Sequence, residues 1–174
     1  SQIVDLAASN EELANYDAYI IAGGGASVNG ADAPNYNKEI FELGKPTLGI
    51  CYGLQLLVKE LGGTVEKLDM REDGPMEISV KTDSIFFEGT PKKQIVLMTH
   101  GDTVTKLPEG FTLDATSDGL TAAVSHEGKK LYGVQFHPET DLTQYGANLI
   151  SNFLFKVSGL QANYTLSLIH ISEP

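Results

Sequence analysis

Apolar runs and amphipathic segments alternate along the first half of the chain. Residues 18–22 form a continuous apolar run, typical of a strand that is covered on both faces of a sheet, and residues 45–48 fit the end of a second buried strand. Residues 54–61 carry apolar side chains at helical spacing and end at Gly62, which predicts a helix. Weaker patterns predict a strand over residues 2–7, a short helix over residues 10–13 with Asn10 as its N-cap, and a helix over residues 37–43.

The second half is richer in strand patterns and closes with a helix. Turn-forming residues 71–75 separate the first two strands, and residues 127–129 join the last two as a hairpin. The predicted strands cover residues 64–68, 76–81, 94–98, 111–116, 120–125 and 131–136. An amphipathic helix is expected over residues 142–157, and its apolar face is formed by Leu149, Ile150, Phe153, Leu154 and Val157.

This order of elements predicts an α/β fold. We expect a mixed, mostly parallel central sheet flanked by helices, in one domain over residues 1–158. Residues 159–174 lose the pattern and are interpreted as a linker or tail.

Composition and charge narrow the function classes. The 174 residues suffice for one core, and a net charge of −11 disfavours binding to nucleic acid, which is a polyanion. No apolar run approaches the roughly 20 residues of a membrane span, and no signal-peptide pattern opens the chain. The single cysteine excludes an internal disulfide and fits a reducing compartment, so a cytoplasmic location is expected.

The strongest chemical signal is a G-x-C-x-G pattern over residues 49–53, between a predicted strand and a predicted helix. In that context it is the thiol form of a nucleophile elbow, a sharp turn that needs small residues two positions before and after the nucleophile. The turn sets the sulfur of Cys51 at a helix N-terminus, whose partial positive charge favours a thiolate. A cysteine that only packs in the core is the alternative interpretation.

A catalytic thiol needs a base, and four histidines are candidates. His126 adjoins the hairpin turn and His170 lies in the patternless tail, which leaves His100 and His137. His137 follows a predicted strand, which would deliver its imidazole to the edge of the sheet. Glu139 can then orient the ring, as in a Cys-His-Glu triad. A solvated histidine at a strand end is the alternative.

An oxyanion hole needs two N–H donors. Elbow geometry supplies one from the backbone of Tyr52. The triple glycine at residues 23–25 follows a predicted strand and is the candidate for the second. The competing interpretation, a phosphate-binding loop, would require G-x-G-x-x-G at the start of a helix, whereas a polar loop follows here.

These residues resemble the class I (triad) glutamine amidotransferase family. Residues 49–55 are similar to its nucleophile motif and residues 134–139 to its His/Glu motif, and His137 follows Cys51 by 86 residues, in the family's order. One branch, whose partner is an ATP-pyrophosphatase synthetase domain, is resembled more closely over residues 62–65, 71–74, 99–104 and 130–133. The resemblance covers residues 1–166.

The resemblance implies a flavodoxin-like fold and hydrolysis of glutamine through a cysteine thioester. The hydrolysis needs no metal or organic cofactor, and ATP and Mg²⁺ belong to the implied synthetase domain. The residues carried over are Cys51 as nucleophile, His137 as general base and acid, Glu139 as its orienter, the N–H groups of Gly24 and Tyr52 as oxyanion donors, Gly53 and Gln55 as binders of substrate glutamine, and His100 and Asp102 as substrate-proximal or interdomain residues.

The chain departs from the family in three places. Gly25 stands where the family has proline, the strand and helix expected before Ser1 are missing, and the synthetase half is absent, so we expect a piece of a longer protein. The alternatives are a glutaminase serving another synthetase, such as one that makes carbamoyl phosphate or anthranilate, a cysteine peptidase or hydrolase on the same scaffold, and a non-catalytic module that only binds a partner.

Overall fold

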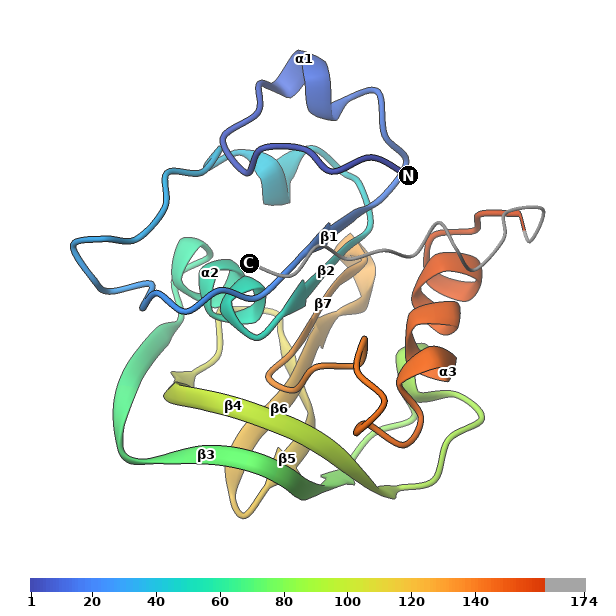
Figure 1. Cartoon of the computed structure of the whole chain (residues 1–174). Coiled ribbons are helices and arrows are strands. Elements are labelled where there is room, and N and C mark those ends of the chain that lie inside the picture. The colour runs from blue at the N-terminus through green and yellow to red at the C-terminus, as the bar shows by residue number, and fades with distance from the viewer. Residues whose placement is uncertain (162–174) are drawn as a thin grey trace.

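A seven-stranded mixed sheet forms the centre of the computed structural model, which describes residues 1–161 (Figure 1). The strand order is β1-β2-β7-β6-β5-β3-β4. The strands are β1 (Tyr19–Ile21), β2 (Thr47–Ile50), β3 (Thr64–Val80), β4 (Lys93–Lys106), β5 (Thr112–Ser117), β6 (Leu120–His126) and β7 (Leu131–Val134). The predicted tail lies mostly outside the described residues, as does His170.

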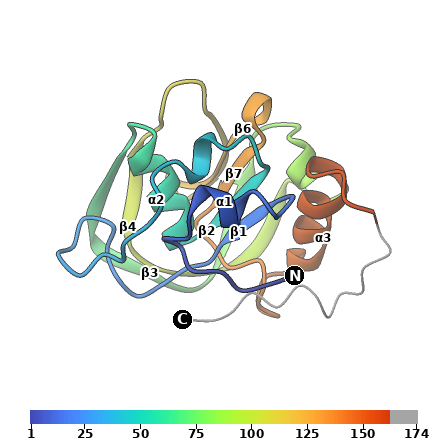
Figure 2. The same cartoon turned by 90° about the horizontal axis from the view of Figure 1, so that it is seen from above.

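Helices cover both faces of this sheet. Helix α2 lies on one side of β1, β2 and β7, and α3 with η4 lies on the other, in both views (Figure 1, Figure 2). The helical segments are α1 (Asn10–Leu13), η1 (Ile40–Glu42), α2 (Tyr52–Glu60), η2 (Ile85–Phe87), η3 (Glu127–Lys129), α3 (Gly146–Ser151) and the π-helical η4 (Asn152–Val157).

Each face of the sheet has its own apolar core. On the α2 side, Leu54 and Leu57 pack with Leu131 of β7 and Val104 of β4. On the α3 side, the core includes Phe86, Phe136, Phe153, Leu149 and Met98. The sheet is therefore sandwiched by helices, as the sequence predicts.

The expectation of a mostly parallel sheet is wrong. Only the pairs β1–β2 and β2–β7 are parallel, whereas the other four neighbouring pairs are antiparallel. The physical reason lies in the connections. A parallel pair needs a crossover of a dozen or more residues, but the strands of the second half are joined largely by short turns, such as residues 118–119 and η3, which return the chain antiparallel.

Residues 64–80 form one strand of 17 residues instead of two. The turn predicted at residues 71–75 does not form, because β4, itself longer than predicted, pairs with β3 on both sides of that segment. Within this strand the pairing with β4 shifts register between Lys67 and Glu72, and Gly74 takes a φ of +105°. Long-range pairing has overridden a local turn signal.

The N-terminal predictions fail for local reasons. Residues 2–7 form no strand, because Asp5 accepts hydrogen bonds from the N–H groups of Ala7 (2.8 Å) and Ala8 (2.9 Å) and turns the chain. Helix α1 forms as predicted, but its N-cap is Ser9, whose Oγ accepts from the N–H of Glu12. The helix expected over residues 37–43 shrinks to η1, because the Asn37 side chain accepts from a nearby backbone N–H.

The final helix starts later than predicted, at Gly146. The residues before it are tied to β4, since the Oγ of Thr143 accepts from the N–H of Leu97 (3.1 Å) and donates to the carbonyl of His137 (2.7 Å). This segment therefore anchors the backbone around His137. The predicted apolar face is confirmed, with Leu149, Ile150, Phe153 and Val157 buried and Leu154 packed against them.

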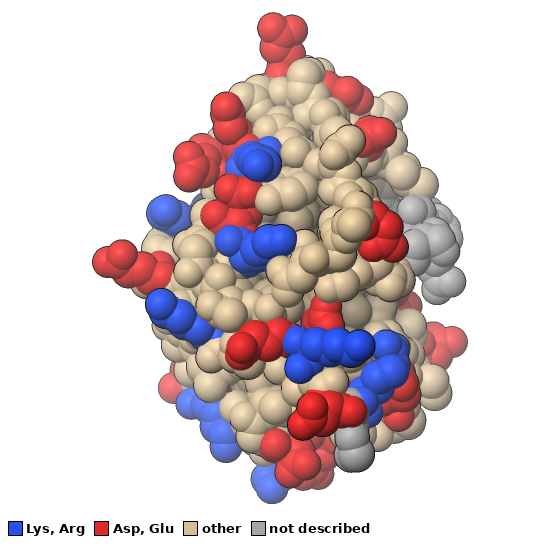
Figure 3. Space-filling model, turned by 90° about the vertical axis from the view of Figure 1, so that its left-hand side faces the viewer, with Lys and Arg blue, Asp and Glu red and all other residues tan. Residues whose placement is uncertain are grey.

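Acidic and basic side chains are interspersed on the face shown in Figure 3. Among the described residues, no helix has the length and apolar character needed to cross a membrane.

A buried hydrogen bond joins β3 to β4 and provides a test of the continuous strand. His100 Nε2 lies 2.6 Å from Glu72 Oε2, and both side chains are almost fully buried. Removing one partner leaves the other buried without its hydrogen bond, so we expect Glu72→Ala to lower the free energy of unfolding by about 1–3 kcal/mol in urea titrations. The neighbouring Asp73→Ala, which removes an exposed ion pair with Arg71, is the control and should change it far less. Equal effects of the two substitutions would contradict the role given to the buried pair.

Candidate active site

Cys51 lies on the tight turn between β2 and α2. Its φ of 55° and ψ of −104° fall in a region that residues with side chains rarely adopt, at a typical cost of about 1–3 kcal/mol. A Cβ on Gly49 would lie 2.5 Å from the carbonyl of Gly53, and one on Gly53 would lie 2.2 Å from the carbonyl oxygen of Ile21. Both positions therefore require glycine, which confirms the elbow geometry that the sequence predicts.

The sulfur lies deeper than the elbow pattern suggests. Cys51 is only 6% exposed, whereas Thr99 and Gly24 beside the site are exposed. The elbow therefore holds the nucleophile at the floor of the site.

The structure brings the three predicted triad residues together. The side chains of Cys51 and His137 meet beside Gly23, and Nδ1 of His137 lies 2.7 Å from Glu139 Oε1. The parallel pairing of β2 with β7 makes this possible, since Ile50 and Val134 are register partners and Cys51 donates its N–H to the Val134 carbonyl (2.8 Å). The two strands thus end side by side, with the nucleophile and the imidazole at the same edge.

The electrostatics of His137 suit an ion pair with the sulfur. Hydrogen bonds with Cys51 and then with Glu139 raise the pKa of His137 from 6.5 to about 10, although burial acts to lower it. At neutral pH the ring is therefore protonated, and an imidazolium beside the sulfur stabilises a thiolate.

Two residues that contact His137 were not predicted to do so from the sequence. A Cβ on Gly23 would lie 3.1 Å from Cys51 Cβ and 3.2 Å from His137 Cε1, so Gly23 packs where the two side chains meet. Thr99 Oγ1 lies 2.9 Å from His137 Nε2. Both belong to stretches that the sequence singles out, the triple glycine and residues 99–104, but only the pairing of distant strands shows that they touch the histidine.

The two predicted oxyanion donors come from the start of α2 and from the loop after β1. Tyr52 opens α2, and the first N–H groups of a helix have no partner within it. Gly24 lies on the loop after β1 with open space around its Cβ position. The loop that follows is tethered to the rest of the site, since Ser27 Oγ donates to Asp102 Oδ2 (2.6 Å) and Lys59 donates to the Val28 carbonyl (2.6 Å).

Gln55, predicted to bind substrate, is buried and already hydrogen-bonded. Its Nε2 donates to the carbonyl of Asp102 (3.1 Å) and to Gln135 Oε1 (3.3 Å). Gln135 in turn donates to Cys51 Sγ at 3.6 Å and was not identified from the sequence. A role of Gln55 or Gly53 toward substrate stays a prediction.

His100 and Asp102 lie in β4 behind the site. Besides its contact with Glu72, His100 Nδ1 lies 2.6 Å from the Asp102 carbonyl, so both ring nitrogens are engaged in the interior. His100 therefore joins β3 to β4 rather than presenting its ring to a substrate. A role of these two residues toward a partner domain stays a prediction.

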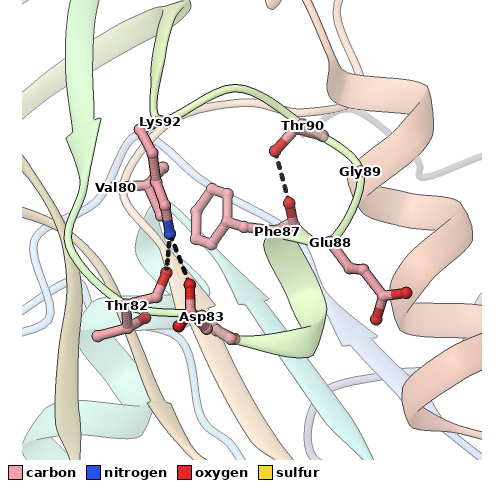
Figure 4. Close-up of a pocket in the computed structure, with 9 residues that line it drawn as sticks. Val80, Thr82, Asp83, Phe87, Glu88, Gly89, Thr90 and Lys92 are labelled. Atoms are coloured by element: carbon pink, nitrogen blue, oxygen red, sulfur yellow. Dashed lines mark hydrogen bonds and ion pairs between the residues drawn. The ribbon is translucent and has the colours of Figure 1, made fainter.

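A separate hollow of about 270 Å³ lies between the end of β3, η2 and the start of β4 (Figure 4). Several of its polar groups bond to one another, since Lys92 donates to the Thr82 carbonyl (2.6 Å) and to Asp83 (3.1 Å) and Thr90 donates to the Phe87 carbonyl (2.7 Å). None of the triad residues lines it. Within residues 1–161, no cluster of three or more His, Cys, Asp or Glu side chains could hold a metal ion.

Comparison with known proteins gives consistent matches over most of the chain. The family model described as glutamine amidotransferase class-I matches residues 1–157. The glutamine-hydrolysing GMP synthase of Clostridium novyi (strain NT) is 45% identical over 169 residues, which cover 95% of this chain and 33% of that protein. That of Bacillus cereus (strain AH820) is 45% identical over 153 residues, covering 87% and 30%. The chain thus spans about a third of the length of these relatives.

Solved structures show the same fold. A putative GMP synthase subunit from Thermoplasma acidophilum superposes with a TM-score of 0.74 at 28% identity, over 86% of this chain and 76% of its own. A glutamine amidotransferase from Thermotoga maritima gives a TM-score of 0.66 at 28% identity, over 83% and 64%.

The pairing of Glu139 with His137 gives a direct titration test. A carboxylate bonded to the ring favours its charged form, so we expect Glu139→Gln to lower the pKa of His137 from about 10 by roughly 1 to 3. The variant ring would then lose its proton at lower pH than in the native protein. The measurement is NMR of carbon-13-labelled histidine side chains between pH 5 and 11.

Glu88→Gln is the control, because Glu88 is exposed and pairs with Lys156 instead. It should leave the titration of His137 unchanged. A titration of His137 that is the same in Glu139→Gln as in the native protein would contradict the triad.

Proposed function

This chain belongs to the class-I glutamine amidotransferase family, and we propose that it is the glutaminase domain of a GMP synthase. In this role it hydrolyses glutamine and supplies ammonia for the conversion of XMP to GMP. The observation that carries the proposal is the contact of Cys51 with His137 and of His137 with Glu139, at a strained elbow in a chain whose relatives are glutamine-hydrolysing GMP synthases.

The first half of the reaction forms a thioester. The Cys51 thiolate attacks the carbon of the side-chain carboxamide, and its electron pair becomes the new C–S bond while the carbonyl electrons move to oxygen. The N–H groups of Tyr52 and Gly24 are suited to hold this oxyanion. His137 gives its proton to the nitrogen, the C–N bond breaks, and ammonia leaves with a glutamyl thioester on Cys51.

The second half releases glutamate. Neutral His137 takes a proton from water, and the hydroxide attacks the thioester carbon. Collapse of the second oxyanion breaks the C–S bond and returns the thiolate, with His137 protonated again. Glu139 holds the ring in one orientation throughout and stabilises its charged form, because its carboxylate is bonded to Nδ1.

The ammonia is consumed elsewhere in the proposed parent protein. An ATP-pyrophosphatase synthetase domain would activate XMP with ATP and Mg²⁺, so those cofactors belong to that domain rather than to the glutaminase chemistry. The length of the relatives, about three times that of this chain, leaves room for such a domain.

An affinity label tests the function without requiring turnover. We expect a glutamine analogue with an electrophilic ketone at the carboxamide position to modify Cys51, the single cysteine of the chain, and mass spectrometry of peptides to locate the adduct there. An excess of glutamine should protect the thiol, whereas unrelated peptides should not. Cys51→Ser is the matched control and should stay unlabelled. Labelling that glutamine does not slow would overturn the assignment of substrate.

The tight packing of Gly23 predicts the effect of one methyl group. We expect Gly23→Ala to reduce kcat for glutamine hydrolysis by roughly 10²-fold, because the new Cβ pushes the imidazole away from the sulfur and small misplacements of catalytic groups are costly. Gly25→Ala is the matched control, since nothing lies within 4 Å of its added Cβ. Full activity in Gly23→Ala would show that the two side chains are not held as described.

A further inference from the structure

Two buried glutamines that the proposed reaction does not use line up behind the nucleophile. Gln135 follows β7 and is 0% exposed, and Gln55 in α2 is 4% exposed. Gln135 Nε2 donates to Cys51 Sγ at 3.6 Å, and Gln55 Nε2 donates to Gln135 Oε1 at 3.3 Å and to the Asp102 carbonyl at 3.1 Å. A continuous hydrogen-bonded chain thus runs from β4 to the sulfur.

The carbonyl of Asp102 fixes the direction of this chain. A backbone carbonyl can only accept, so Gln55 must turn its NH₂ group toward Asp102. The same NH₂ group faces Gln135, so Gln135 must present its oxygen there and its own NH₂ group to Cys51. A flip of Gln55 would set its oxygen against the Asp102 carbonyl, and a flip of Gln135 would set its NH₂ group against that of Gln55. Both mismatches are buried, which makes their cost large.

Asp102, where this series of hydrogen bonds begins, makes two further hydrogen bonds. Its carbonyl also meets His100 Nδ1 at 2.6 Å, and its carboxylate accepts from Ser27 Oγ at 2.6 Å. His100 is paired with Glu72 in turn. The two glutamine amides therefore have little freedom to reorient, and the N–H group that Gln135 directs at the sulfur is preorganised.

We propose that Gln135 is a further catalytic residue, whose amide N–H donates to the Cys51 thiolate and stabilises it, with Gln55 and the Asp102 carbonyl as the positioning groups. The inference deepens the proposed function, since it concerns the same nucleophile, but it depends on the sulfur alone and not on which substrate is bound. It places a donor at the thiolate that is independent of His137. The charge is then shared between an imidazolium and a neutral amide, both before the thiolate attacks and when breakdown of the thioester returns it.

Other charged groups near the sulfur are His137 and Glu139, which follow β7, and Arg71 of β3, whose charge also acts on Cys51. None of them is altered in the variants below. Changes in the reactivity of the thiol can therefore be assigned to the amide.

The experiment measures alkylation of the thiol by iodoacetamide in the whole chain. Because Cys51 is the single cysteine, the rate reports on that sulfur alone. The readout is the ratio of the rate at pH 6 to that at pH 9. A thiolate that has lost a stabilising donor persists less well at pH 6 but is formed at pH 9, whereas a merely structural disturbance changes both rates together.

Two variants remove the donor in different ways. Gln135→Met keeps an unbranched chain of similar size and a weak acceptor for Gln55 but has no donor. Gln135→Glu keeps the shape and a strong acceptor but replaces the NH₂ group with oxygen. We expect the ratio to fall roughly tenfold in Gln135→Met, the usual effect of a hydrogen bond to a charged group, and further in Gln135→Glu, where a carboxylate repels the thiolate.

Gln94→Glu is the matched control, because Gln94 is equally buried (2% exposed) and donates to two acceptors at the far end of β4. It should leave the ratio unchanged, and thermal unfolding followed by circular dichroism shows whether each variant is folded. If Gln135→Glu does not fold, Gln135→Met still gives the answer.

An unchanged ratio in a folded Gln135→Met protein, or an equal fall in Gln94→Glu, would overturn the inference. The outcome is separable from that of the proposed function. If glutamine fails to protect Cys51 from the affinity label but the ratio falls in both Gln135 variants, the substrate assignment is wrong and the amide donor stands. If glutamine protects the thiol but the ratio is unchanged, the amide donor is wrong and the substrate assignment stands.

Discussion

Parallel pairing of β2 with β7 is the contact on which this site depends. The register joins Ile50 to Val134 and continues into the hydrogen bond from Cys51 N–H to the Val134 carbonyl. It brings the elbow and the residues after β7 to one edge of the sheet, although they are separated by more than 80 positions in the sequence. A slip of one residue would send the side chains on β7 to opposite faces and take His137 and Gln135 away from the sulfur.

Close packing then fixes what the pairing brings together. Glycine at positions 49 and 53 lets the elbow contact its own helix and β1. Gly23 lets the loop after β1 approach Cys51 and His137 closely. The strained backbone at Cys51 is held in place by the buried strand before it and the buried helix after it. Few degrees of freedom remain at the sulfur, which suits a group that must be ready before the substrate arrives.

The polar groups of the site extend well behind the triad. From Cys51 one path leads through His137 to Glu139, and a second leads through Gln135 and Gln55 to Asp102. Asp102 also holds Ser27, on the loop that carries Gly24. The strand β4 therefore supports both Cys51 and the candidate oxyanion loop.

The sequence by itself predicted which three residues meet as the candidate triad, because an elbow and a strand end impose residue types at fixed short spacings. It likewise indicated α2, the hairpin at η3 and the apolar face of the last helix, which all depend on local periodicity. Only the tertiary structure decided that β3 continues through residues 71–75, that most pairs are antiparallel, and that His100 is buried against Glu72. It also decided that Gly23, Thr99 and Gln135 contact the catalytic side chains. Those outcomes rest on contacts between residues far apart in the chain, and no local pattern encodes which distant group will be the neighbour.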